Sequence, residues 1–280
     1  MTAATLPGRA DRIMVMGVLN VTPDSFSDGG RWTAVDDAVA RGIALRDAGA
    51  DLVDVGGEST RPGAAAVAPA DELARVLPVV TALAEVGVPL SIDTVHARTA
   101  AAALDAGALL VNDVSGGLAD RDMARVVADA GCPWVLMHWR GPSDRMAELA
   151  RYDDVVLEVR DELSARVDAA VAAGIDVDRL VLDPGLGFAK TGEHNWQLLA
   201  QLDVIVGLGL PVLVGASRKS FLGRLLADHS GNPRPIEERE DATTALTAVC
   251  AAAGVWGVRV HEVRPSVDAA LTVAAIRVAR

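Results

Sequence analysis

The chain has 280 residues, a formal net charge of −12 at pH 7, and 51% hydrophobic residues. Binding to nucleic acids or anionic membranes requires a basic face, which we do not expect in so acidic a chain. We therefore expect neither partner. Its two cysteines, Cys132 and Cys250, belong to no metal-binding spacing, which argues against a zinc site or a disulfide framework. We see no secretory signal and no apolar run long enough to cross a membrane, and therefore expect a cytoplasmic protein.

Apolar runs of strand length alternate with longer stretches of helical periodicity along the whole chain. This alternation is typical of βα units around a parallel sheet. We expect the strands at 13–19, 52–55, 89–92, 109–112, 134–138, 180–183, 212–215 and 257–260. Eight such units predict an α/β protein with a single (β/α)8 TIM barrel at 13–280, preceded by an N-terminal extension at 1–12.

An open, doubly wound sheet is the competing architecture. Its first turn usually carries the phosphate-binding pattern G-x-G-x-x-G, which the first turn here, at 20–30, lacks. No linker or shift in composition divides the chain, so one domain is favoured. Long polar loops follow strands 1, 2 and 5, at 20–32, 56–69 and 139–154, and in a barrel these loops lie on the catalytic face.

Polar residues end three different strands of the predicted barrel: Asp93, Asn112 and Asp183. Each could simply cap the next helix, but together they would face one mouth. Carboxylates accept N–H bonds and an amide both donates and accepts, so this set suits a nitrogen heterocycle. Lys219, just past the seventh strand, would add a cation that donates to a ring atom; alternatively, it is a solvated lysine at a helix start.

The last strand ends in Val258-Arg-Val-His261, which places Arg259 and His261 on the same side of the strand. Barrels often bind phosphate near strands 7 and 8, and a guanidinium suits phosphate oxygens. We therefore expect a phosphate site here; the alternative is a buried Arg259 that a carboxylate neutralises. The chain has no nucleophile elbow, P-loop or zincin motif, so the sequence does not indicate covalent catalysis.

Seven blocks spread over nearly the whole chain carry a recognisable pattern. They are MGVLNVTPDSFSDGG (16–30), DVGGESTRPG (54–63), SIDT (91–94), VNDVSGG (111–117), LDPGLGF (182–188), GASRK (215–219) and VRVH (258–261). The first two blocks are long and specific. Together the seven blocks resemble those of the dihydropteroate synthases, a family of pterin-binding enzymes.

The resemblance implies a transferase of folate biosynthesis that condenses 7,8-dihydropterin-6-ylmethyl diphosphate with 4-aminobenzoate, giving 7,8-dihydropteroate and diphosphate. It implies Mg2+ as cofactor, bound with the diphosphate by Asn20, and a homodimer. The pterin diphosphate would be held by Thr60, Asp93, Asn112, Asp183, Lys219, Arg259 and His261. The 4-aminobenzoate would lie against Phe26, Pro62, Phe188 and Ser220. The residues implied in catalysis are Asp28, Arg61, Asp93, Lys219, Arg259 and His261, with Asp28 and Arg61 tying the first two loops together.

The implied reaction is SN1-like, with diphosphate leaving before the amine attacks. Two other functions remain open, a methyltransferase acting on methyltetrahydrofolate and a pterin-binding paralogue without activity. The methyltransferase would not be expected to carry both long loop blocks, and the silent paralogue would lack a loop or phosphate residue. Trp139 and Arg140 depart from the family pattern, and we expect them to alter the pocket wall.

Overall fold

The computed structural model describes residues 5–22, 30–58 and 67–279, with only the backbone described at 30–33. Eight parallel strands form one sheet in the order β6-β5-β4-β3-β2-β1-β8-β7. They are β1 (Met14–Asn20), β2 (Leu52–Gly56), β3 (Leu90–Asp93), β4 (Leu110–Asp113), β5 (Trp134–Met137), β6 (Leu180–Asp183), β7 (Leu213–Val214) and β8 (Gly257–Val260). A parallel bridge between Leu182 and Val212 joins the two ends of this order and closes the barrel. The predicted fold class is confirmed, and each strand lies within one residue of its predicted bounds at either end.

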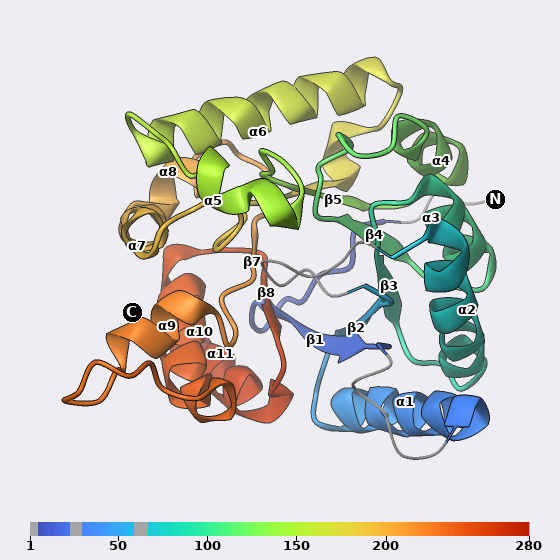
Figure 1. The fold of residues 1–280 in the computed structure, drawn as a ribbon, viewed down its shortest axis with the longest axis horizontal. Coiled ribbons are helices and arrows are strands. Elements are labelled where there is room, and N and C mark those ends of the chain that lie inside the picture. The colour runs from blue at the N-terminus through green and yellow to red at the C-terminus, as the bar shows by residue number, and fades with distance from the viewer. Residues whose placement is uncertain (1–4, 23–29, 59–66, 280) are drawn as a thin grey trace.

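Helices surround the strands in a ring (Figure 1). They are α1 (Gly30–Asp47), α2 (Pro69–Glu85), α3 (Ala97–Asp105), α4 (Met123–Ala130), α5 (Met146–Leu149), α6 (Val155–Ala172), α7 (Gly192–Ala200), α8 (Leu202–Val206), α9 (Ser220–Leu225), α10 (Glu240–Ala253) and α11 (Val263–Val278). Local capping sets several of their ends. The Asp154 side chain accepts from two backbone N–H groups at the start of α6, and α4 ends at Gly131 in the left-handed conformation (φ 61°).

The barrel interior has an apolar lower part and a polar upper part. Side chains alternate in direction along a strand, so every second residue points inward. The lower layers hold the buried cluster Met14, Met16, Leu52, Leu110, Val135, Val181 and Leu213. Two residues further along their strands come Asp54, Asn112 and Asp183, at the carboxyl ends. A second, larger apolar cluster fills the space between the strands and the helices. The polar layer therefore lies at the end of the barrel where the long loops begin.

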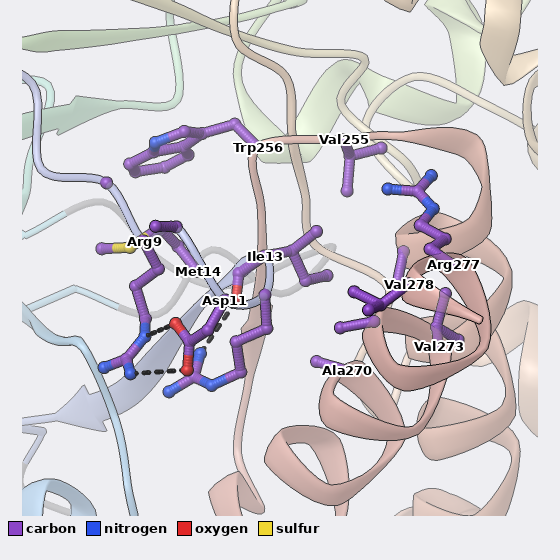
Figure 2. A pocket seen from close by; sticks show the side chains of 15 residues that line it. Arg9, Asp11, Ile13, Met14, Val255, Trp256, Ala270, Val273, Arg277 and Val278 are labelled. Atoms are coloured by element: carbon purple, nitrogen blue, oxygen red, sulfur yellow. Dashed lines mark hydrogen bonds and ion pairs between the residues drawn. The ribbon is translucent and has the colours of Figure 1, made fainter. Parts of the chain in front are cut away.

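The N-terminal segment crosses the opposite end of the barrel. Leu6 packs against the interior cluster, and Trp256 Nε1 donates to the carbonyl of Pro7 at 2.9 Å. Arg12 pairs with Asp51 at 2.6 Å. Figure 2 shows the pocket that this segment forms with the start of β8 and with α11, far along the strands from their carboxyl ends. The division between an extension at 1–12 and a domain at 13–280 stays a prediction.

Among the described residues, no helix combines the length and apolar character needed to cross a membrane. The long loop after β5 carries a 3-10 turn at Ser143–Arg145 and the short helix α5. Most of the long loops after β1 and β2 falls outside the described residues.

Candidate active site

The centre of the polar layer is Asp54, a carboxylate on β2 with no solvent exposure. It accepts hydrogen bonds from Ser91 Oγ at 2.6 Å, from Asn112 Nδ2 at 2.9 Å and from Arg259 Nε at 2.6 Å. These bonds connect β2 to β3, β4 and β8 across the barrel mouth. Our sequence analysis did not place Asp54 among the functional residues. The available signal was a charged residue inside an otherwise apolar strand, Leu52-Val-Asp-Val55.

Arg259 joins two carboxylates. Besides Asp54, its Nη2 contacts Asp93 Oδ2 at 2.6 Å, so the guanidinium is neutralised from within the barrel, as the alternative interpretation proposed. Burial raises the pKa of Asp93 to about 7, although the charge of Arg259 opposes this shift. The Arg259 side chain is still 19% exposed, and Nε and Nη2 make its two ion pairs. Nη1 therefore remains available to bind an anion in the mouth.

Asp183 and Lys219 lie on the other side of the mouth. Asp183 Oδ1 accepts from the backbone N–H of Gly185 at 2.7 Å. Burial raises the pKa of Asp183, and the charge of Lys219 opposes this. Burial likewise lowers the pKa of Lys219 to about 8, while Asp183 acts in the opposite direction. The charges of Arg259 and Asp93 also act on Lys219, and Asn112 joins the same layer through its hydrogen bond to Asp54.

Gly215, the residue after β7, has no side chain between Asp183 and Arg259. A Cβ at this position would lie 3.9 Å from Asp183 Oδ2 and 4.0 Å from Arg259 Cβ. Lys219 Nζ donates to the carbonyl of Leu186 and lies 4.6 Å from the centroid of the Phe188 ring. The mouth therefore combines carboxylate and amide acceptors, two cations and one half-buried aromatic ring.

His261 follows β8 at the rim. Its Nδ1 lies 2.9 Å from Ser217 Oγ, and its backbone N–H donates to the same oxygen at 3.2 Å. Asn20 is the last residue of β1, half-buried and in register with Gly56 of β2. Ser220 is exposed at the start of α9. The five predicted loop residues Phe26, Asp28, Thr60, Arg61 and Pro62 lie outside the described residues.

Arg140 does not face the mouth. It pairs with Glu158 and Glu162 of α6, and its guanidinium carbon lies 3.8 Å from the centroid of the Tyr152 ring. The contacts of Arg140 are therefore with α6 and Tyr152, and its predicted effect on the pocket wall finds no support in them.

Comparisons with known proteins decide the family. The family model described as pterin binding enzyme matches residues 16–261. A dihydropteroate synthase of Mycobacterium leprae is 59% identical over 264 residues, covering 94% of this chain and 93% of that protein. The chain belongs to the dihydropteroate synthase family. A synthase of this family from Synechocystis is 45% identical, covering 90% of this chain and 86% of that protein.

Solved structures of dihydropteroate synthases have the same fold. The enzyme of Xanthomonas albilineans with 4-aminobenzoic acid has a TM-score of 0.87 at 47% identity, covering 96% of this chain and 94% of that one. The Clostridium difficile enzyme in the presence of pteroic acid has a TM-score of 0.89 at 38% identity, covering 97% and 99%. Membership of the dihydropteroate synthase family makes this chain an enzyme of the transferase class. These relatives favour a synthase over the methyltransferase considered above.

Proposed function

We propose that this chain condenses 7,8-dihydropterin-6-ylmethyl diphosphate with 4-aminobenzoate, giving 7,8-dihydropteroate and diphosphate. The observation that carries the proposal is the arrangement of hydrogen-bonding groups in the mouth. Asp93, Asn112 and Asp183 present acceptors, and Lys219 is a donor beside them. A pterin ring carries several N–H groups and one carbonyl, which complement this set. A Xanthomonas albilineans relative was solved in complex with 7,8-dihydropteroate, which supports the assignment.

The second substrate would bind between Lys219 and the two long loops. Phe188 supplies an aromatic face next to Lys219, and Ser220 is an exposed hydroxyl one residue further along. By family resemblance, Phe26 and Pro62 would complete this pocket, Thr60 would lie near the pterin, and Asp28 and Arg61 would tie the loops together. A ring stacked on an aromatic face agrees with the geometry that aromatic pairs prefer.

The chemistry follows from where charge develops. The bond between the pterin methylene and the diphosphate oxygen breaks, and the oxygen keeps the electron pair. Arg259 and His261 would stabilise the leaving anion, while Asp93 offsets the positive charge left on the pterin. The aminobenzoate nitrogen then forms the new C–N bond and loses a proton. A neutral aniline needs no strong base before it attacks, so no nucleophile dyad is required.

Mg2+ fits the residues present if the diphosphate supplies most of its ligands. The described residues contain no group of three or more His, Cys, Asp or Glu that could hold a metal ion alone. Mg2+ usually keeps several waters and binds through few protein oxygens plus substrate phosphates. The Asn20 amide oxygen at the end of β1 would be such a ligand. When bound, Mg2+ would neutralise charge on the leaving diphosphate.

One assay distinguishes the synthase from a silent pterin-binding paralogue. Diphosphate release from the pterin diphosphate is measured at saturating Mg2+, with and without 4-aminobenzoate, together with the formation of dihydropteroate. We expect stoichiometric product and diphosphate when both substrates are present, and loss of both after chelation of Mg2+. Tight pterin binding without release would overturn the proposal.

We further propose a cytoplasmic homodimer. The two helices α10 and α11 pack against each other and carry exposed apolar side chains, Val249 (50% exposed), Leu271 (43%) and Ile276 (54%). An exposed apolar surface of this kind suits a subunit interface. Both cysteines are free and buried, which agrees with a reducing compartment. Sedimentation of the wild type and of Ile276→Glu tests the dimer. We expect the mass of a dimer for the wild type and of a monomer for the variant; the mass of a monomer for both would refute the proposal.

A further inference from the structure

Lysine is rare in this chain. Of the 26 Lys and Arg residues only two are lysine, Lys190 and Lys219, so arginine serves as the cation everywhere else. Lys219 has a role in the proposed reaction. Lys190 is also buried, with 8% exposure, but the reaction steps above do not use it. Burial lowers the pKa of Lys190 well below its usual range, so the charged form needs partners that offset its loss of hydration.

The Lys190 ammonium lies against the residues 185–188, which we call the Gly185–Phe188 turn. Nζ donates to the carbonyl oxygens of Gly185 and Phe188, both at 3.1 Å, and contacts His138 Nδ1 at 2.8 Å. A lysine ammonium has three protons, and these three acceptors satisfy all of them. One side chain therefore joins the first and last residues of the turn to the residue that follows β5.

The direction of the bond to His138 follows from its other partner. His138 Nε2 lies 2.9 Å from Glu162 Oε2 on α6. Burial opposes ionisation of Glu162, but hydrogen bonds from His138 and Arg140 bring its pKa down to about 2. An ionised carboxylate can only accept, so Nε2 carries the ring proton and Nδ1 accepts from Lys190. Burial and then the charge of Lys190 lower the pKa of His138 to about 4, which keeps the ring in this neutral form.

The Gly185–Phe188 turn in its correct conformation positions two residues of the mouth. Its first N–H binds Asp183, and the carbonyl of Leu186 accepts from Lys219. The turn also passes very close to Lys219. A Cβ added at Gly187 (φ 81°) would lie only 3.0 Å from Lys219 Cδ. A small displacement of the turn would therefore move both Asp183 and Lys219.

A compact ammonium is well suited to this task, and a guanidinium is not. All three hydrogen bonds converge on one atom, Lys190 Nζ, from directions supplied by two carbonyls and a ring nitrogen. Arginine spreads its donors over a rigid planar fork, so they would not converge on one point between these three acceptors. This explains why an arginine-rich chain keeps a lysine at this buried position.

We propose that Lys190 is a positioning residue of this enzyme: its ammonium, oriented by His138, holds the Gly185–Phe188 turn in the conformation that presents Asp183 and Lys219 to the substrate. The identity of that substrate rests on the proposed function, whereas the contacts are those of the free protein. Lys190 acts through the turn and not by touching the reacting atoms.

The kinetic test compares variants of both partners. Lys190→Met removes the donors and keeps the length, and we expect kcat/KM for the pterin diphosphate to fall at least tenfold. Lys190→Arg keeps the charge, and we expect it to restore little of this loss. His138→Gln can accept from Lys190 and donate to Glu162, so its kcat/KM should stay within about threefold of wild type. His138→Leu can make neither hydrogen bond, and its kcat/KM should fall as much as that of Lys190→Met. Equal activity of the Gln and Leu variants, or normal activity of Lys190→Met, would overturn the proposal.

Arg140→Ala is the matched control, because it removes the other partner of Glu162 and leaves the bond between Lys190 and His138. We expect kcat/KM within twofold of wild type. If Lys190→Met does not fold, the comparison of His138→Gln with His138→Leu still tests whether His138 acts through its hydrogen bonds or only through packing.

A spectroscopic readout separates this proposal from the proposed function. With only two lysines, protein labelled with 15N at lysine Nζ gives two side-chain ammonium signals. We expect the Lys219 signal to shift in Lys190→Met and in His138→Leu, and to keep its position in Arg140→Ala. A Lys219 signal unchanged in all three would refute the positioning role even in an active enzyme. Absence of product from the wild type would instead refute the proposed reaction.

Discussion

Asp54 Oδ2 accepts a hydrogen bond from Asn112 Nδ2 at 2.9 Å. An ionised carboxylate has no proton to donate, so this bond determines which end of the Asn112 amide faces Asp54. The amide oxygen is thereby the end of Asn112 that does not bind Asp54, and it can accept from another donor. A fully buried residue on β2 thus sets the hydrogen-bonding polarity of a ligand-binding candidate on β4.

Asp54→Asn should lower catalytic activity although it nearly keeps the size of the side chain. The new amide can donate as well as accept, so it no longer orients Asn112, and Arg259 loses one of its two ion pairs. Charge-assisted hydrogen bonds contribute about 1.5 kcal/mol or more each, so loss of two should lower kcat/KM for the pterin diphosphate roughly 100-fold. Steady-state kinetics measures this loss.

Asp51→Asn is the control for Asp54→Asn. Asp51 is also a carboxylate of low exposure, but it binds Arg12 at 2.6 Å and the N–H of Val15 at 2.8 Å at the other end of the barrel. We expect a lower free energy of unfolding with kcat/KM within twofold of wild type. If Asp54→Asn behaves in the same way, Asp54 only stabilises the fold.

Activity should fall as the pH rises through about 8. Burial lowers the pKa of Lys219 to about 8, and deprotonation removes the positive charge of Lys219 and one of its three donor protons. The charged fraction is complete well below pH 8 and is lost above it. The pH profile of kcat/KM reports this group in the free enzyme. Lys219→Arg stays charged, so the decline near pH 8 should disappear; its persistence would assign the decline to another group.

Stability should fall between pH 4 and pH 7 because of Asp93. Burial raises its pKa to about 7, so the folded protein keeps this proton over a range in which the unfolded chain has released it. The folded state then binds more protons, and the free energy of unfolding decreases as the pH rises. Above pH 7 this contribution levels off. Denaturant unfolding of Asp93→Asn should show a flatter dependence over pH 4–7, whereas an identical slope would contradict the assignment.

Ser217→Ala should weaken phosphate binding. Ser217 Oγ contacts both Nδ1 and the backbone N–H of His261, so its loss removes the contact that orients Nδ1 of the imidazole. A hydrogen bond of this kind contributes about 1 kcal/mol, and KM for the pterin diphosphate should rise roughly fivefold. Ser266→Ala is the control, because Ser266 is also buried but accepts a hydrogen bond from Thr247 between α10 and α11. Equal KM values in both variants would rule out the role of Ser217.

The strands and the barrel could be predicted because their signals are local. Apolar runs of strand length, separated by helical periodicity, placed all eight strands within one residue. The same alternation put Asp93, Asn112 and Asp183 at strand ends, and carboxyl ends of parallel strands meet in a barrel. The roles of these residues toward substrate and metal stay predictions, as do those of the loop residues Phe26, Asp28, Thr60, Arg61 and Pro62.

The partners of each buried charge could not be predicted, because hydrogen bonds connect residues that only the closed barrel brings together. Asp54 and Arg259 are 205 positions apart in the sequence, and His138 and Lys190 are 52 positions apart. Sequence left open whether Arg259 is neutralised by a carboxylate.

By itself, the sequence determined the order of βα units and the residue types at their ends, since these depend on neighbours along the chain. Only the tertiary structure decided how charge is distributed in the mouth. Burial removes water from Asp54, Asp93 and Arg259, and their stability then depends on direct contacts whose distances no local pattern contains.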